Sequence, residues 1–237
     1  MTTAATAALA SLEGRVVTCR RCPRLVAWRE QVAREKRAAF ADEPYWGRPI
    51  PGFGDPAARV VLLGLAPAAH GANRTGRAFT GDRSGDFLFA ALHRTGFANQ
   101  PTSRRAGDGL RLSDAWITAA VRCAPPANRP TPSERDTCLP WAVEELSLLR
   151  SARVVVCLGA FAWAAALRLR AHLGHPPPAP RPRFGHGAEW LHPPLPLIGT
   201  FHPSQQNTFT GRLTPAMLDT VLQRAREVAE LGFRIQT

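Results

Sequence analysis

The sequence predicts an α/β fold, a three-layer α/β/α arrangement around a central, four-stranded, mainly parallel sheet. Short apolar runs rich in β-branched residues recur along the chain, and a segment with helical periodicity follows each of them. Strands that alternate with helices pair in parallel and are covered on both faces. A length of 237 residues with 45% hydrophobic residues suits one core. We therefore expect a single domain over residues 1–237.

The predicted elements follow one another in a regular order. Charged and apolar residues recur at helical spacing from Leu25 to Phe40, and the prolines and glycines between Glu43 and Pro56 predict a loop. The predicted strands are 59–64, 115–121, 154–158 and 197–201, and the helices that follow them are 84–94, 133–149, 160–172 and 214–231.

Three long segments rich in Gly, Pro, Asn, His and Thr follow predicted strands: Leu65 to Gly81, Arg122 to Pro132, and His202 to Arg212. The carboxyl ends of parallel strands meet at one edge of a sheet, and open α/β sheets bind their ligands there. Long loops on an otherwise economical scaffold are more often functional than decorative. We therefore expect the functional site at this edge.

The charge of the chain is strongly positive. Its formal net charge is +12, and Lys36 is the only lysine, so nearly every positive charge is an arginine. Arginine binds phosphate oxygens bidentately, and an arginine-rich surface is typical of nucleic-acid binders. A codon bias that enriches Ala, Arg, Gly and Pro together explains the same composition, so the charge alone leaves the partner open.

The first twelve residues lack the basic and apolar regions of a signal peptide, and no apolar stretch reaches the roughly 18 residues of a membrane span. We expect a cytoplasmic, nucleoid-associated protein. Its odd number of cysteines, five, argues against a disulfide framework and favours metal ligation or simple burial.

The cysteine spacing favours a metal site. Cys19 and Cys22 form a C-x2-C pair, and Cys123 and Cys138 flank a proline-rich loop and a helix start. Four thiolates without histidine suit structural zinc or an iron–sulfur cluster, and spacing does not separate these two or exclude scattered buried thiols. Cys157 lies inside an apolar strand, where a cysteine acts as a small hydrophobic residue.

The loops that follow the predicted strands resemble those of a known protein family. The segment from Gly64 to Asp82 has neither a Walker lysine nor the spacing of a dinucleotide loop, so it does not indicate nucleotide binding. The chain resembles the iron–sulfur uracil-DNA glycosylases of type B, often called family five. The similarity rests on the cysteine tetrad and on the motifs 64–71, 73–82, 121–128, 202–204 and 210–214.

The resemblance implies a uracil-DNA glycosylase-like fold and a [4Fe-4S] cluster that braces it without a redox step, with zinc as the minor alternative. The expected cluster ligands are Cys19, Cys22, Cys123 and Cys138. The implied activity is that of a monofunctional DNA-repair glycosylase, which hydrolyses the N-glycosidic bond of a deaminated base and leaves an abasic site. The expected partner is double-stranded DNA, bound by a monomer.

Breaking this bond creates positive charge on the sugar and negative charge on the departing base. By resemblance, Asp82 stabilises the sugar or orients water, Asn128 assists it, and His202 donates a hydrogen bond to the base. Asp82 also suits a helix N-cap, and both roles can coexist. Outside the resemblance, Asn128 would be a turn residue.

The resemblance also implies the residues that contact the base and the DNA. Phe79 offers an aromatic face for a flipped base, with core packing as its alternative. The expected base-binding residues are Gly64, Leu65, Ala66, His70 and Phe79, and the expected DNA contacts are Arg74, Arg77, Ser204, Gln205, Gln206 and Arg212. Gln205 and Gln206 are the candidates that fill the gap left by the extruded nucleotide.

Two departures from the strict uracil enzymes affect the expected substrate range. Those enzymes carry an asparagine at the end of the second strand, where this chain has Ile117 to Ala120, and a polar residue in the first motif, where it has Ala66 and Ala68. We therefore expect Asp82 and Asn128 to carry the catalysis. A pocket without polar discrimination rejects little, so we expect activity on uracil and also on hypoxanthine, xanthine or ethenocytosine.

Two other function classes compete with this one. A relative that binds damaged DNA without turnover would use the same loops, and the effect of replacing Asp82 separates it from an enzyme. A zinc-dependent deaminase needs an H-x-E motif with P-C-x2-C, and this chain lacks that pattern.

Overall fold

A computed structural model describes residues 2–231. Its sheet has six strands in the order β1-β3-β2-β4-β6-β5 within this range. The four predicted strands form the parallel centre: β2 (Val60–Gly64), β3 (Ala115–Ala119), β4 (Val154–Leu158) and β6 (Leu197–Thr200). The sequence analysis missed β1 (Phe53–Gly54) and β5 (Glu189–Trp190), which add antiparallel edges and are too short to show periodicity.

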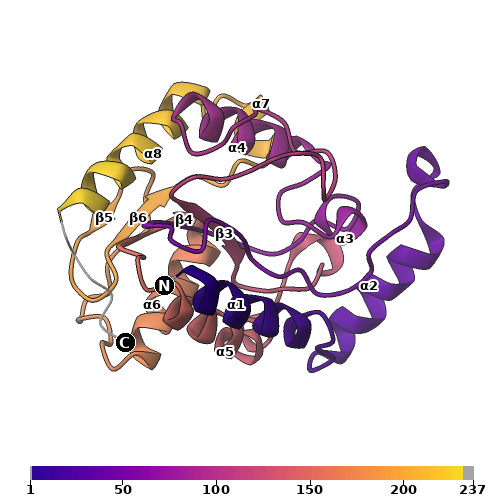
Figure 1. Ribbon diagram of the computed structural model, residues 1–237, viewed down its shortest axis with the longest axis horizontal. Coiled ribbons are helices and arrows are strands. Elements are labelled where there is room, and N and C mark those ends of the chain that lie inside the picture. The colour runs from indigo at the N-terminus through magenta and orange to yellow at the C-terminus, as the bar shows by residue number, and fades with distance from the viewer. Residues whose placement is uncertain (1, 232–237) are drawn as a thin grey trace.

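Helices cover both faces of the sheet (Figure 1). Helices α4 (Arg83–Arg94) and α8 (Pro215–Glu230) pack on one face, and α1 (Thr2–Val16), α5 (Pro132–Leu148) and α6 (Ala160–His172) lie on the other. Each face of the sheet has its own apolar core, and alternate residues of β2 pack into one or the other. Val60 and Leu62 face α4 and α8, whereas Val61 and Leu63 face α5 and α6. The predicted three-layer α/β/α class is therefore confirmed.

The helices before the first central strand differ from the predicted ones. Helix α2 (Pro23–Glu35) ends earlier than predicted, because Lys36 adopts a φ of 55° and only a short 3-10 turn, η1 (Ala38–Phe40), follows. Helix α1 was not predicted, because its small polar residues carry a narrow apolar stripe. That stripe, which includes Leu12 and Val16, packs against Trp141 of α5.

The predicted loops contain short helical turns: α3 (Ala72–Thr75), η2 (Pro126–Asn128) and α7 (Gln205–Phe209). All three loops leave the carboxyl edge of the parallel strands. The strand order reverses at β2, which lies between β3 and β4, so the crevice beside Gly64 is the topological switch point where such sheets bind ligands. Among the described residues, no helix has the length and apolarity needed to cross a membrane.

Candidate active site and cysteine cluster

Asp82 is the N-cap of α4 and lies at the end of the loop that follows β2. Its Oδ1 accepts a hydrogen bond from the backbone N–H of Gly85 at 2.9 Å, so the predicted capping role is present. A Cβ at Gly71 would overlap the Oδ2 of Asp82, so this glycine makes room for the carboxylate. Burial raises the pKa of Asp82 above its ordinary value, despite the backbone hydrogen bonds from Gly85 and Ser84.

Phe79 lies between Gly64 and His202. Its ring edge would be 2.8 Å from a Cβ at Gly64, and its ring centroid is 5.9 Å from that of His202. Its φ of 52° lies in the left-handed region that only glycine adopts freely. Such strain in a bulky residue is typical of a functional site, and here it turns the ring toward the end of β2.

His202 follows β6, and its Cβ would be 3.2 Å from a Cβ at Gly159. The φ of 98° and the missing side chain of Gly159 therefore let the loop after β4 pass close to this histidine. Burial lowers the pKa of His202 to about 4, so the imidazole is neutral near pH 7. A neutral imidazole keeps one N–H donor without burying a cation.

The low pKa of His202 makes folding stability depend on pH. An exposed histidine titrates near 6.5, so the unfolded chain binds a proton between about pH 6.5 and 4 that the folded chain does not. The free energy of unfolding therefore falls as the pH drops through this window. Urea unfolding at about pH 7 and about pH 4.5 should show wild type losing about 2 kcal/mol more than His202→Gln. Equal losses in the two proteins would mean that His202 titrates as an exposed histidine.

Leu65, Ala66 and His70, the other residues expected to bind the base, lie on the loop that follows β2. Leu65 accepts a hydrogen bond from the backbone N–H of Val121, which ties the start of the loop to the end of β3, and Ala66 is half-buried. His70 is half-buried with its Nδ1 3.0 Å from the hydroxyl of Tyr45, a partner that the sequence analysis did not identify.

Asn128 lies on another loop, the one that follows β3. It is exposed in η2 with a φ of 55°, and no hydrogen bond joins it to Asp82 in the part of the chain that the structure describes. The left-handed backbone fits the turn role that was considered for it. The structure therefore brings together Gly64, Phe79 and His202, and Gly71 with Asp82.

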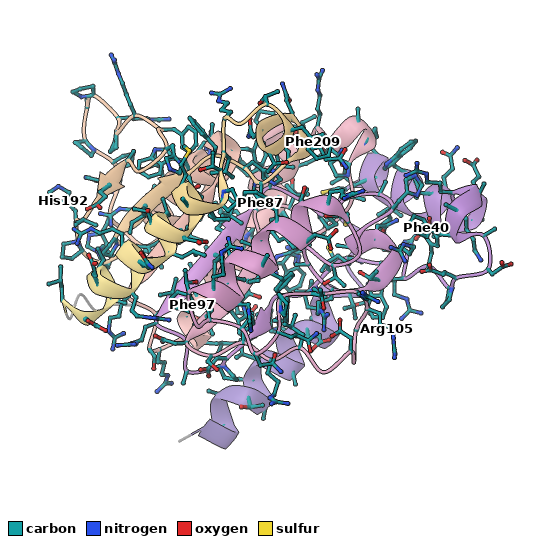
Figure 2. The ribbon with its side chains drawn as sticks, turned by 90° about the horizontal axis from the view of Figure 1, so that it is seen from above. Phe40, Phe87, Phe97, Arg105, His192 and Phe209 are labelled. Carbon is teal, nitrogen blue, oxygen red and sulfur yellow. The ribbon has the colours of Figure 1, made fainter. Side chains whose placement is uncertain are left out.

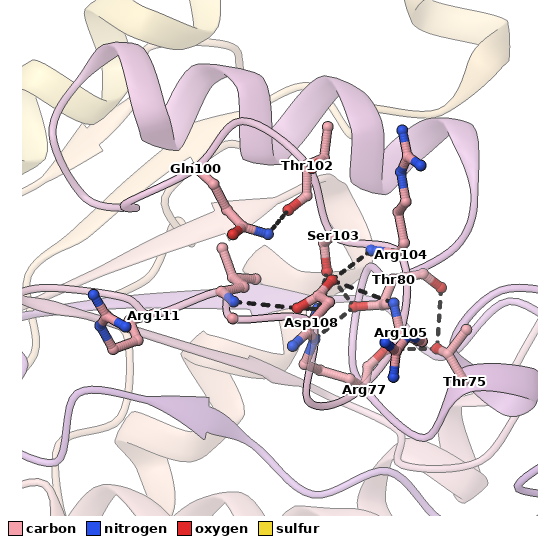
Figure 3. Close-up of polar contacts among 12 residues, drawn as sticks. Thr75, Arg77, Thr80, Gln100, Thr102, Ser103, Arg104, Arg105, Asp108 and Arg111 are labelled. Carbon is pink, nitrogen blue, oxygen red and sulfur yellow. Dashed lines mark hydrogen bonds and ion pairs between the residues drawn. The ribbon is translucent and has the colours of Figure 1, made fainter.

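Arg74 and Arg77, on the loop that follows β2, form ion pairs with carboxylates of the protein itself. Arg74 is 8% exposed, forms an ion pair with Glu43, and donates to the carbonyl oxygens of His70 and Gly81, each at 2.9 Å. Arg77 is 10% exposed and forms an ion pair with Asp108 at 2.8 Å (Figure 3). Both side chains hold loops together. The DNA contacts expected for them stay a prediction.

The loop after β6 presents the remaining predicted DNA contacts. Gln205 and Gln206 are exposed on α7, Ser204 is half-buried before it, and exposed Arg212 places its guanidinium carbon 4.5 Å from the ring centroid of Phe201. Phe209 is 72% exposed at the rim of the molecule (Figure 2), an unusual position for a large apolar side chain.

Asn207 organises this loop. Its side-chain amide donates a hydrogen bond to the backbone carbonyl of His202 at 2.8 Å. Its backbone carbonyl accepts a hydrogen bond from the N–H of Leu213 at 3.0 Å. The sequence analysis missed Asn207, as it missed Gly71 and Gly159. The signal that could have found them is their place, since Gly71 and Asn207 lie in predicted loops and Gly159 directly follows a predicted strand.

The four predicted ligand cysteines line one small cavity, together with Trp141 and residues of α2. Cys19 and Cys22 precede α2, Cys123 follows β3, and Cys138 lies on α5, so the cavity joins segments far apart in the sequence. Cys157 is fully buried within β4 and away from this cavity, as predicted. Within residues 2–231, no cluster of His, Cys, Asp or Glu is arranged to hold a single metal ion.

Hydrogen-bond donors point at two of these sulfur atoms. Arg29 is 2% exposed, and its Nη1 lies 2.9 Å from the Sγ of Cys123. The backbone N–H of Arg122 lies 3.3 Å from the Sγ of Cys138. A guanidinium is expensive to bury without an anion, and the carboxylate of Glu30 approaches Arg29 only to 3.8 Å. This donor set fits sulfur that carries negative charge, as metal-bound thiolates do.

The comparisons identify the family. The sequence model of the uracil DNA glycosylase superfamily matches residues 51–226, most of the chain. The chain belongs to the uracil-DNA glycosylase superfamily.

Within the superfamily, the chain is similar over nearly its whole length to type-5 uracil-DNA glycosylases. That of Mycobacterium tuberculosis (strain CDC 1551 / Oshkosh) is 57% identical over 93% of this chain and 82% of the relative. That of Thermus thermophilus is 53% identical over 91% of this chain and 96% of the relative. A type-4 uracil-DNA glycosylase of Archaeoglobus fulgidus is 36% identical over only 48% of this chain. The chain therefore belongs to the type-5 branch.

Proposed function

We propose that this glycosylase hydrolyses the N-glycosidic bond of uracil in double-stranded DNA and leaves an abasic site. The observation that carries the proposal is the position of a half-buried carboxylate, Asp82, and a neutral imidazole, His202, on loops at the switch point of the sheet. The names of the type-5 relatives support it. The single lysine, Lys36, donates to the carbonyl of Ala41 beyond α2, which supports hydrolysis without a lysine nucleophile.

The two groups meet opposite charges as the bond breaks. The carboxylate of Asp82 stabilises the cationic sugar or orients the attacking water, and partial desolvation strengthens its electrostatic effect. The N–H of His202 meets the negative charge on the departing base. Phe79 supplies the stacking face, and the amide of Asn128, on the loop after β3, assists with the water or the base.

We propose a broad range of bases that includes hypoxanthine, xanthine and ethenocytosine. Thr118, the polar side chain near the end of β3, donates to Glu145 at 2.6 Å on the α5 side of the sheet. Ala119 and Ala120 then leave no amide to read a base edge, and Ala66 adds no polar group from the first motif. Few polar groups in the pocket mean weak discrimination.

The DNA contact that we propose uses the loop after β6. Exposed Gln205, Gln206 and Arg212 lie on it, and exposed Phe209 adds an apolar wedge of the kind that unstacks a base step from the minor groove. Ser204 starts the turn that carries them. We propose that the protein acts as a monomer on nucleoid DNA in the cytoplasm.

We also propose that Cys19, Cys22, Cys123 and Cys138 hold a [4Fe-4S] cluster. The shared cavity and the donors of Arg29 and Arg122 support an anionic, sulfur-ligated group at this place. When bound, the group joins α2, α5 and the end of β3 and stabilises the fold, with no redox step in the hydrolysis. One of its proposed ligands, Cys123, lies in the loop after β3, which is one of the three expected site loops.

The packing of Gly71 against Asp82 yields a prediction. Gly71→Ala should lower the single-turnover excision rate on the order of 100-fold, because the added methyl displaces the carboxylate although Asp82 itself is retained. Gly14→Ala is the matched control, since a Cβ there meets nothing within 4 Å. Equal rates in the two variants would show that the position of Asp82 is not critical.

The proposed function is tested with duplex oligonucleotides that carry one uracil, hypoxanthine, xanthine or ethenocytosine. Excision is read as a strand break after alkali. We expect cleavage at uracil and at one or more of the other bases. Cleavage at uracil alone would overturn the broad specificity, and tight binding of damaged DNA without cleavage of any substrate would favour a damage-binding protein.

A further inference from the structure

The loop between α4 and β3 packs directly against the segment that carries Asp82. The carbonyl of Ser103 accepts a hydrogen bond from the N–H of Gly81 at 3.0 Å, and the hydroxyl of Ser103 lies 2.6 Å from that of Thr80 (Figure 3). The carbonyl of Arg104 would be 3.4 Å from a Cβ at Gly81. Residues 102–109, here called the arginine loop, therefore border the candidate active site.

Asp108 fixes the shape of the arginine loop from within. Its carboxylate pairs with Arg77 and accepts from the backbone N–H groups of Arg104 at 2.8 Å, Arg105 at 3.3 Å and Leu110 at 3.2 Å (Figure 3). Burial opposes ionisation, but these hydrogen bonds lower the pKa of Asp108 to about 2. The loop is therefore held by an ionised hub at every pH near neutrality.

Asp108 binds the backbone N–H groups of Arg104 and Arg105 and leaves their guanidinium groups exposed to solvent. Arg104 and Arg105 are exposed, and neither forms an ion pair within residues 2–231 (Figure 2 labels Arg105 at the periphery). Some surface arginines are neutralised, as exposed Arg94 is by Asp219 and half-exposed Arg224 by Glu189. Two adjacent cations on a rigid loop repel each other, so this arrangement favours an anionic partner.

We propose that the arginine loop is a phosphate-binding element, with Arg104 and Arg105 gripping the sugar-phosphate backbone of the DNA strand that carries the excised base. The choice of this DNA strand rests on the proposed function: if Asp82 acts on the target nucleotide, that nucleotide lies beside the arginine loop. Guanidinium forks bind phosphate oxygens bidentately, and a loop fixed beforehand loses little entropy when it binds.

The test measures the affinity for undamaged duplex DNA by fluorescence anisotropy at several NaCl concentrations. Each phosphate contact contributes about 0.9 to the slope of log K against log salt. We expect Arg104→Ala/Arg105→Ala to reduce the slope by about 1.8 and the affinity several-fold, and Arg104→Lys/Arg105→Lys to recover most of the slope. Arg150→Ala is the control, because Arg150 is an exposed arginine that precedes β4, at the opposite edge of the sheet.

The same proteins are assayed for uracil excision, which separates this proposal from the proposed function. If wild type excises uracil but the double alanine variant changes the salt slope no more than Arg150→Ala, the arginine loop is not a phosphate site. If the slope falls as expected but wild type excises no base, the DNA-binding role of the loop stands and the glycosylase assignment fails.

Discussion

Asp82→Asn is expected to lower the rate of uracil excision on the order of 10²- to 10⁴-fold, with DNA affinity retained. Asparagine has the same shape and is an equally good N-cap, so its Oδ1 can still accept from the N–H of Gly85. What is lost is the negative charge that meets the cationic sugar. Single-turnover excision, DNA binding and urea unfolding together separate this loss from a folding defect.

Two further variants sharpen the Asp82 experiment. Asp86→Asn removes an exposed carboxylate from the same turn of α4 and should keep the rate within a few-fold of wild type. Asp82→Ala loses the cap as well, which costs about 1 kcal/mol of stability beyond the asparagine variant. Full excision by Asp82→Asn would show that Asp82 takes no part in the chemistry and acts only as the N-cap of α4.

From the proposed [4Fe-4S] cluster we expect wild type to be brown and to contain iron and sulfide, and Cys123→Ala to lack both and to unfold on the order of 10 °C or more lower. Cys123 lies in the shared cavity and faces Arg29, so its loss removes one ligand and leaves a buried guanidinium without its sulfur partner. Iron, sulfide and zinc analysis of the purified protein, with thermal unfolding, provides the measurement.

Cys157→Ala is the matched control for the cluster, because this buried cysteine packs in β4 without touching the cavity. It should keep its iron and lose about 1 kcal/mol, a shift of about 2–4 °C. Iron retained in full by Cys123→Ala would contradict the proposed tetrad. Zinc in place of iron and sulfide would keep the tetrad and change the cofactor.

The central strands and their helices were predictable because each is a buried apolar run or a long periodic segment. The edges were not, since β1 and β5 pair over two residues each and carry no periodic signal. The end of α2 was missed because Lys36 takes a left-handed backbone, which favours glycine and which the sequence does not announce. Helix α1 is stabilised chiefly by its packing on α5, and such tertiary stabilisation overrides local pattern.

The candidate site was predictable in its loops but not in the use of every side chain. Asp82, Phe79 and His202 could be named because they lie in loop motifs that resemble those of a known family. The ion pairs of Arg74 and Arg77 could not be predicted, because an arginine in a polar loop has the same sequence signature whether it faces DNA or a carboxylate of the protein. Their partners, Glu43 and Asp108, lie 31 residues away from them in each case, and only the fold brings them together.

The most direct test of the account is the product of a single turnover on duplex DNA with one uracil. Free base and sugar product of the wild-type protein are measured before and after alkali. The account predicts released uracil and an intact abasic strand that breaks only after alkali. No released base, or a strand cut before alkali, would contradict a hydrolytic glycosylase centred on Asp82.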